Sequence, residues 1–395
     1  MREKGWSILG VVCSLAMIAA ACGGGDEKPA DGGDLPQTVG EGEGALNLIA
    51  WIGYTENGST DPNSDWVTPF EDKTGCKVSV KYGNTSDEMV TLMRQGGGKL
   101  YDGVSASGDA TNRLIAAGDV AGVNTDLVPS WKDFIPTLQS PAHNTVGGVH
   151  YGVSYMYGAN VLLYNTQQAS PAPTSWDAVF DPNSPYAGKI TAYDSPIYIA
   201  DAAMYLMNHQ PDLGIKDPYE LTQTQLDAAV ALLKGQKPNV KKYWSLAADE
   251  IDLFTSGELV VGTAWPYQVS VLQSDSQPVK ATIPSEGATG WADTWMMSKN
   301  AQHPNCMYKW MDWASTPEVQ AQVAEFYGAT PPNTKSCDII TADLGAKAAE
   351  PYHCGDDAFV HQLFLWKTPL ADCGDGKNDC VDYSVWQQKW TEIKG

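Results

Sequence analysis

The residues best suited to chemistry lie in the segment GATGWADTWMM at positions 287–297. Successive side chains of an extended strand point to opposite faces, so Trp291, Asp293 and Trp295 are predicted to share one face. A carboxylate between two indoles suits an organic cation, because indole faces attract ammonium groups by roughly 0.5–2 kcal/mol and the carboxylate adds a charge-assisted hydrogen bond. The same pattern also fits a buried strand whose aspartate caps a neighbouring loop.

The sequence contains none of the common catalytic motifs. It has no GxSxG elbow, HExxH helix or Walker loop, and its six histidines are scattered without ligand spacing. A secreted hydrolase would need an activated nucleophile or a pair of acids such as Asp194 and Asp293, and no base with an orienting partner accompanies them. We therefore expect a protein that is not an enzyme and that uses no metal or cofactor.

Short apolar strands alternate with helical patterns along the chain. Strands are predicted at 45–51, 77–82, 101–106, 160–165, 189–194 and 258–265. Helices are predicted near 65–72, 86–95, 109–117, 198–208, 226–235, 304–314, 317–326, 357–366 and 384–393. This alternation predicts parallel βαβ units, and hence two open, mostly parallel α/β sheets flanked by helices.

Several predicted strands are followed by aromatic or polar residues. In open α/β sheets, ligands bind outside the carboxyl ends of the strands. The residues at these positions are Trp51, Tyr54, Ser107, Asp109, Asp194, Tyr198, Trp265 and Tyr267. A single Trp or Tyr more often packs in a core or at a rim, and it is the shared position after strands that favours a binding site.

The N-terminus has the features of an export signal. Arg2 and Lys4 precede an apolar run at 8–18, which ends in Ala19-Ala20-Ala21-Cys22. Residues 1–21 are therefore predicted to be a signal peptide. The string resembles a bacterial lipoprotein signal, in which Cys22 becomes the lipidated first residue and 22–44 forms a flexible tether. An ordinary signal peptide with a chance cysteine is the alternative.

The mature chain is strongly acidic. Removing Arg2, Lys4 and Glu3 leaves 23 basic and 46 acidic side chains, a net charge of −23. Nucleic acid is therefore not expected as a partner. The remaining length is enough for two lobes of ordinary domain size, and no second apolar run could cross a membrane.

Six further cysteines are an even number in an exported protein, which favours disulfides over metal binding or catalysis. Cys373 and Cys380 flank the turn-rich GDGKND and are predicted to pair. Cys337 with Cys354 is the second predicted pair, which leaves Cys76 with Cys306. Free buried thiols are the alternative.

Six separated strings carry a family resemblance. They are WIGY (51–54), YDGVSAS to AAGDV (101–120), YGANVLLYN (157–165), TSWDAVFDPNSPYAGKI (174–190), GWADTWMM (290–297) and PEVQAQVAEFYGATPPN (317–333). In order and spacing, the chain from about Leu46 to Asn333 resembles the spermidine/putrescine-binding proteins of ABC importers, which are type II periplasmic binding proteins.

The resemblance implies a two-lobed receptor that closes on its solute and then docks on a permease. It implies chain crossings near 155–158 and 283–290. The lobes it implies are 45–155 with 286–340, and 156–285 with 341–395 and the C-terminal helices. The positions that match the family's ligand contacts are Trp51 and Tyr54, Ser107, Asp194 on the second lobe, the stacking residues Trp265 and Trp291, and Asp293, which would hold an amine.

Four positions depart from the family pattern. Ile197 stands where a second-lobe glutamate is usual, Ile52 replaces a polar residue, Ala329 a tyrosine and Lys367 a glutamine. A linear polyamine needs two or three spaced acceptors, because a buried, unpaired ammonium group is costly. A zwitterion such as an amino acid, aminobutyrate or aminoalkylphosphonate, paired through Lys367, is therefore the close alternative to putrescine or spermidine.

Together these features predict a monomeric, lipid-anchored solute-binding protein on the outer face of the cytoplasmic membrane. Its partners would be a small cationic or zwitterionic solute and an ABC importer permease, and the lipid would be its only membrane attachment. A surface adhesin is a third possibility, which predicts no defined small-molecule cleft and no stabilisation on adding solute.

Overall fold

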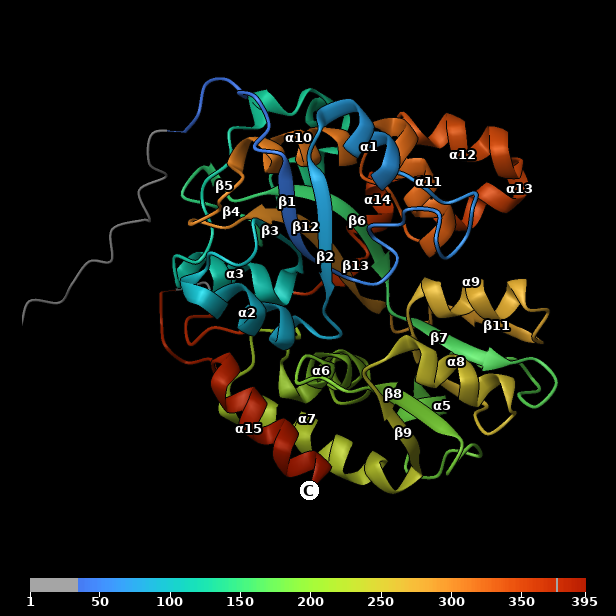
Figure 1. Cartoon of the computed structure of the whole chain (residues 1–395). Coiled ribbons are helices and arrows are strands. Elements are labelled where there is room, and N and C mark those ends of the chain that lie inside the picture. The colour runs from blue at the N-terminus through green and yellow to red at the C-terminus, as the bar shows by residue number, and fades with distance from the viewer. Residues whose placement is uncertain (1–34, 374–375) are drawn as a thin grey trace, which may run out of the picture.

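The computed structural model describes residues 35–373 and 376–395. The predicted signal peptide and Cys22 lie outside the described residues. Within them, no helix is long and apolar enough to cross a membrane. The chain forms two α/β lobes, one around each of two main sheets (Figure 1).

The first sheet has the strand order β13-β12-β3-β1-β2, and β6 pairs with β12. Its strands are β1 (Ala45–Ala50), β2 (Lys77–Tyr82), β3 (Gly103–Ser107), β6 (Val153–Ala159), β12 (Ala288–Met297) and β13 (Leu363–Leu365). β1 is parallel to β2 and β3, whereas the fully buried β12 is antiparallel to β3 and β6. The long strand β12 therefore lies in the middle of the lobe with neighbours on both sides.

The second sheet has the order β11-β7-β10-β8-β9. Its strands are β7 (Val161–Asn165), β8 (Ile190–Tyr193), β9 (Val240–Trp244), β10 (Val261–Ala264) and β11 (Val279–Thr282). β8 is parallel to both β9 and β10, and β7 is antiparallel to β10 and β11. The short strands β4 (Thr145–Val146) and β5 (Val149–His150) form a separate pair.

Helices flank both sheets (Figure 1). Around the first sheet lie α1 (Val67–Thr74), α2 (Ser86–Arg94), α3 (Gly108–Ala116), α10 (Pro304–Ala314), α11 (Pro317–Tyr327) and α12 (Ser336–Leu344). Around the second lie α5 (Asp177–Phe180), α6 (Tyr198–His209), α7 (Gln223–Gln236), α8 (Ala247–Thr255), α9 (Pro266–Ser274) and α15 (Tyr383–Lys394). The short helices are α4 (Pro136–Gln139), α13 (Ala346–Ala349) and α14 (Asp357–Val360).

The chain passes between the two sheets at Asn160, which separates β6 from β7, and again at 283–287, between β11 and β12. It passes a third time after β13, toward α15. Figure 1 shows β6 continuing into β7 from one lobe to the other. The crossings are the segments whose backbone must rotate if the lobes separate.

One predicted helix is wrong in its second half. The sequence predicts a helix near 357–366, but α14 ends at Val360 and Leu363–Leu365 forms β13. This strand pairs in parallel with Ala288–Gly290 at the edge of the first sheet. Pairing satisfies backbone groups of β12 that would otherwise be buried without partners, and this tertiary demand overrides the local helical pattern. A part of 341–395 therefore joins the first sheet rather than the second.

Three disulfides join the six cysteines in the pairs that the sequence favoured, Cys76–Cys306, Cys337–Cys354 and Cys373–Cys380. The first links the start of β2 to α10 across 230 residues of sequence. Glu43, in the predicted tether, accepts hydrogen bonds from the backbone N–H groups of Asn305 and Cys306. The last residues of the tether are thus held against the same helix.

Candidate ligand-binding site

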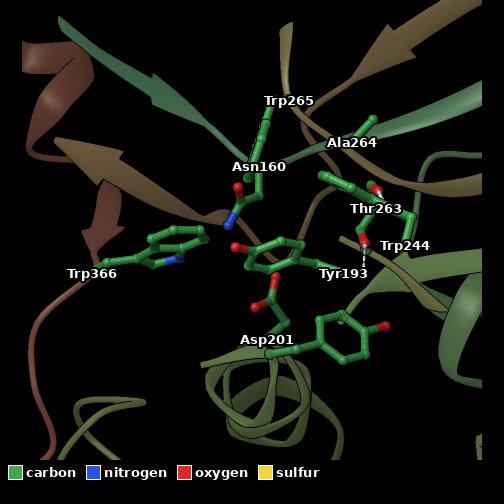
Figure 2. Close-up of a pocket in the computed structure, with 9 residues that line it drawn as sticks. Asn160, Tyr193, Asp201, Trp244, Thr263, Ala264, Trp265 and Trp366 are labelled. Carbon is green, nitrogen blue, oxygen red and sulfur yellow. Dashed lines mark hydrogen bonds between the residues drawn. The ribbon is translucent and has the colours of Figure 1, made fainter. Parts of the chain in front are cut away.

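Two small cavities lie next to each other between the lobes. The Asp293 cavity is lined by Trp51, Ser107, Trp265, Trp291, Asp293, Tyr327 and Trp366. The Asp201 cavity is lined by Asn160, Tyr193, Tyr198, Asp201, Trp244, Thr263, Ala264, Trp265 and Trp366 (Figure 2). Each has a volume of about 10 Å³. That is space for about one water molecule, so a larger guest requires the walls to move apart.

Asp293 lies on β12, directly opposite Ser107 of the antiparallel neighbour β3. The Ser107 hydroxyl donates a hydrogen bond to its Oδ1, and the Tyr54 hydroxyl donates to its Oδ2 at 2.6 Å. The side chain is buried, and burial raises the pKa of Asp293 to about 7, against the lowering effect of the two hydrogen bonds. The carboxyl group is therefore oriented by two neutral donors.

Aromatic rings from both lobes form the walls of the Asp293 cavity. Trp51 follows β1 and meets Trp265, which follows β10, edge to face with ring centroids 5.7 Å apart. Trp291 meets Tyr327, at the end of α11, in the same way at 5.9 Å. The indole N–H groups of Trp51 and Trp291 are buried and make no hydrogen bond to described residues. These walls offer ring faces and edges around a carboxylate.

Asp201 lies in the first turn of α6, a helix that is buried on all sides from Tyr198 to Leu206. Its Oδ1 accepts a hydrogen bond of 2.8 Å from the hydroxyl of Thr289, which in turn accepts one of 2.7 Å from the side-chain amide of Asn160. Burial raises the pKa of Asp201 to about 7, and the Thr289 hydrogen bond opposes that shift. Asp201 is thus a second buried acid with a neutral donor.

Tyr193 connects the acid to the aromatic wall. Its ring stacks on Trp366 with centroids 5.7 Å apart and an angle of 10° between the planes. Figure 2 shows its hydroxyl end directed toward Trp366, with Asn160 and Asp201 on either side. The hydroxyl is buried and has no hydrogen-bond partner among the described residues. A buried polar group without a partner is uncommon, and here it faces a cavity.

The structure brings together most of the residues that the sequence predicted to bind ligand. Trp51, Ser107, Trp265, Trp291 and Asp293 all line the Asp293 cavity. Tyr54 lies behind it as a hydrogen-bond donor to the carboxylate. Trp51, Ser107 and Trp265 thus lie at the ends of parallel strands as predicted, whereas Trp291 and Asp293 lie within β12.

Asp194 is engaged elsewhere. Its carboxylate contacts the Lys394 ammonium group at 2.5 Å and accepts a hydrogen bond of 3.0 Å from the Trp390 indole, and both partners belong to α15. It lines neither cavity. The side chain holds the C-terminal helix against the second lobe, so it forms no catalytic pair of acids with Asp293.

Trp295 is on β12 two residues beyond Asp293 but also lines neither cavity. It lies in the core of the first lobe, with Tyr155 and Trp310 each 5.5 Å from it between ring centroids. Besides Trp291, the indoles near Asp293 are therefore those of Trp51 and Trp265, and not that of Trp295 on β12.

Several lining residues escaped the sequence analysis, namely Asn160, Tyr193, Asp201, Trp244, Thr263, Ala264, Tyr327 and Trp366. One of them, Asp201, could have been found from the sequence. Asp201 is the single carboxylic acid in the apolar helical run YIADAAMYLM at 198–207. An acid in a helix that is apolar all round must be buried, and a buried acid needs a partner.

The structure shows the contacts of Lys367 and the burial of Ile197, Ala329 and Ile52, the four positions that depart from the family pattern. Lys367 is held by Asp217 at 2.8 Å and Glu220 at 2.5 Å. Ile197 and Ala329 are fully buried, and Ile52 is half exposed. The charge of Lys367 is thus balanced by two acids from the segment between α6 and α7 of the second lobe.

Comparison with known proteins gives a consistent result. The profile of a family described as bacterial extracellular solute-binding protein matches residues 65–349. A putrescine/agmatine-binding protein of Pseudomonas aeruginosa is 26% identical over 306 residues, which cover 71% of this chain and 79% of that protein. A spermidine/putrescine-binding periplasmic protein of Escherichia coli is 22% identical over 310 residues, which cover 76% and 85%.

Solved structures show the same fold. A putative spermidine/putrescine ABC transporter protein from Listeria monocytogenes superposes with a TM-score of 0.72 at 21% identity, over 89% of this chain and 99% of that one. The resemblance seen in the sequence and the expected two-lobed α/β fold are both confirmed.

Proposed function

This chain belongs to the bacterial extracellular solute-binding proteins, the receptors of ABC importers, and we propose that its solute is an organic amine held by Asp293 between the lobes. The protein is a receptor and not an enzyme. As a receptor it would bind the solute, close, and present it to a permease.

The observation that carries the proposal is a buried carboxylate without a cation. Asp293 is 3% exposed, and among the residues that the structure describes its side chain receives hydrogen bonds only from two hydroxyl groups. No lysine, arginine or histidine lines either cavity within the described part of the chain. A buried carboxylate is stable in its charged form only when paired, so the site favours a guest that brings the positive charge.

The aromatic walls support the same class of solute. Indole and phenol faces attract an ammonium group, each by roughly 0.5–2 kcal/mol when water is excluded. They also cover the methylene groups of an alkylamine. The amine-binding relatives in Pseudomonas aeruginosa and Escherichia coli support an amine as well.

A zwitterionic solute is less well supported. Its carboxylate would need a cation, and Lys367, the candidate in the sequence, is already bound by Asp217 and Glu220. Opening that pair would leave two acids without a partner. The amine therefore remains the first choice, and aminobutyrate belongs in the test.

We also propose the cellular setting. Lipidation at Cys22 would hold the receptor on the outer face of the cytoplasmic membrane, with two acyl chains for stable attachment. The permease of the importer would be its partner, and the receptor would act as a monomer.

The test is calorimetry on the mature protein, freed of co-purified solute by unfolding and refolding with its disulfides intact. We expect putrescine or spermidine to bind, and Asp293→Asn to weaken binding at least about 30-fold, because the variant leaves the buried ammonium group unpaired. Asp194→Asn is the matched control, since Asp194 lines neither cavity, and it should keep the affinity. Binding of aminobutyrate but of no polyamine, or an unchanged Asp293→Asn, would refute the proposal.

A further inference from the structure

The proposed function uses Asp293 and leaves Asp201 without a role. Asp201 is 4% exposed and has one neutral hydrogen-bond donor, Thr289, from outside its own helix. Within the described ranges, no lysine, arginine or histidine lines the cavity that contains it. It is thus a second buried acid that lacks a cation, on the opposite lobe from Asp293.

The two acids belong to one continuous space when the walls separate. Trp265 and Trp366 line both cavities, so the cavities meet at these two indoles. A chain that runs from one acid to the other would pass between them, and their ring surfaces would cover its methylene groups. The unpartnered Tyr193 hydroxyl lies on the Asp201 side and can accept a hydrogen bond from an ammonium group there.

The spacing between the acids follows approximately from strand β12, because Asp293 belongs to this strand and Asp201 is hydrogen-bonded to it through Thr289. Asp201 is bonded to Thr289, and Asp293 lies four residues further along the same strand, on the same face. Four residues of strand span about 13 Å, and this separation of the Thr289 and Asp293 backbones approximates the separation of the two carboxylates. Two charge-assisted hydrogen bonds take up about 3 Å each, which leaves about 7 Å between the nitrogen atoms of a bridging solute. A chain of four or five carbon atoms covers that distance.

Asp201 also supplies the acceptor that Ile197 had seemed to remove. Ile197 is the N-cap residue of α6 and Asp201 lies in the first turn of that helix, so the two are one turn apart. Ile197 is fully buried in the core, whereas Asp201 lines a cavity. The second lobe thus presents an acid one helical turn after Ile197.

We propose that Asp201 is a second ammonium site and that the solute is a linear diamine of four or five carbon atoms, with one ammonium group at Asp293 and the other at Asp201. This inference rests on the proposed function. It excludes a zwitterion, whose carboxylate would face Asp201 or Asp293. It also disfavours a triamine, because the described linings offer two carboxylates and a third buried ammonium group would remain unpaired.

Calorimetry with a set of amines tests the inference. The probes are 1,3-diaminopropane, 1,4-diaminobutane, 1,5-diaminopentane, spermidine and the monoamine butylamine. For the wild type we expect the four- and five-carbon diamines to bind tightest. Asp201→Asn keeps the shape of the side chain and an oxygen for the Thr289 hydroxyl. It should weaken 1,4-diaminobutane at least about 30-fold and change butylamine binding less than about threefold.

Calorimetry distinguishes a failure of the proposed function from a failure of the second ammonium site at Asp201. If the wild type binds no amine, the proposed function fails. If it binds 1,4-diaminobutane and a folded Asp201→Asn binds it equally well, only the second site is refuted. Should Asp201→Asn not fold, Asp201→Glu keeps the charge and moves it inward by one methylene group. The affinity of 1,3-diaminopropane relative to 1,4-diaminobutane should then rise, and an unchanged ratio would refute the site.

Discussion

At the scale of single residues, the two buried acids link solute binding to protons. Burial raises the pKa of both Asp293 and Asp201 to about 7 in the free protein. An ammonium group beside a carboxylate lowers that pKa again. Below pH 7, a solute must therefore displace protons before it can pair with the acids.

We predict that affinity for a diamine falls as the pH is lowered from 8 to 5. Each acid can contribute up to a tenfold loss per pH unit below its free-state pKa, because one proton leaves per acid on binding. Calorimetry at pH 6 in buffers of different ionisation enthalpy counts the released protons. Asp201→Asn should reduce that count, and binding at pH 6 without proton release would contradict the prediction.

At the same scale, Asp194 shows that a position after a strand does not by itself place a side chain in a cavity. It follows strand β8, as a ligand contact should, but Lys394 and Trp390 occupy its carboxylate. A charge that already has a good partner within the protein gains little from a ligand. The presence of a partner, and not the position in the sequence, separates Asp194 from Asp201.

At the scale of elements, the start of α3 positions a wall of both cavities. Gly108 is the first residue of α3, directly after β3, and the carbonyl oxygen of Trp366 lies against it so closely that an added Cβ would collide. The absence of a side chain therefore lets the segment after β13 approach the first lobe. This contact sets where the Trp366 indole lies.

We predict that Gly108→Ala pushes Trp366 outward, lowers stability by about 1–3 kcal/mol and weakens solute binding. Gly235→Ala is the control, because Gly235 lies inside α7 with nothing near the position of a Cβ. That change should raise stability by up to about 1 kcal/mol and leave affinity unaltered. Thermal unfolding and calorimetry measure both. Wild-type affinity in Gly108→Ala would show that Trp366 is not positioned by this contact.

At the scale of the whole molecule, the site exists only where the two lobes meet. The Asp293 cavity is lined in part by Trp265, which belongs to the second lobe. The Asp201 cavity is lined in part by Trp366, which follows β13 of the first sheet. Both cavities are the size of one water molecule, so entry of a diamine requires the lobes to separate about the crossings at Asn160 and 283–287.

The long disulfide acts on the unfolded state of the whole chain. Cys76–Cys306 closes a loop of 230 residues, whereas Cys373–Cys380 closes one of 7. We predict that replacing both cysteines of the long pair with serine lowers the free energy of unfolding by about 5.5 kcal/mol, and the same change in the short pair by about 2.4 kcal/mol. Denaturant unfolding of the two double variants tests the order. A larger loss for the short pair would contradict the loop-entropy argument.

Much of this protein could be read from its sequence. The spacing of apolar residues that marks a strand or a helix repeats every few residues and is visible in a short stretch of sequence. β1, β3 and α10 were therefore predicted close to their observed bounds. Asp293 was found because its aromatic neighbours are adjacent in the same strand. The short Cys373–Cys380 bridge follows from spacing alone.

Only the tertiary structure decided which of the acids Asp194 and Asp201 lines a cavity. Asp194, Ile197 and Asp201 follow one another across the end of β8 and the first turn of α6. Their orientation depends on how α6 is rotated against β12, and on α15, whose Lys394 reaches Asp194 from 200 residues away. These are contacts between segments far apart in the chain. Local periodicity specifies which residues share a face, but only long-range packing determines what that face meets.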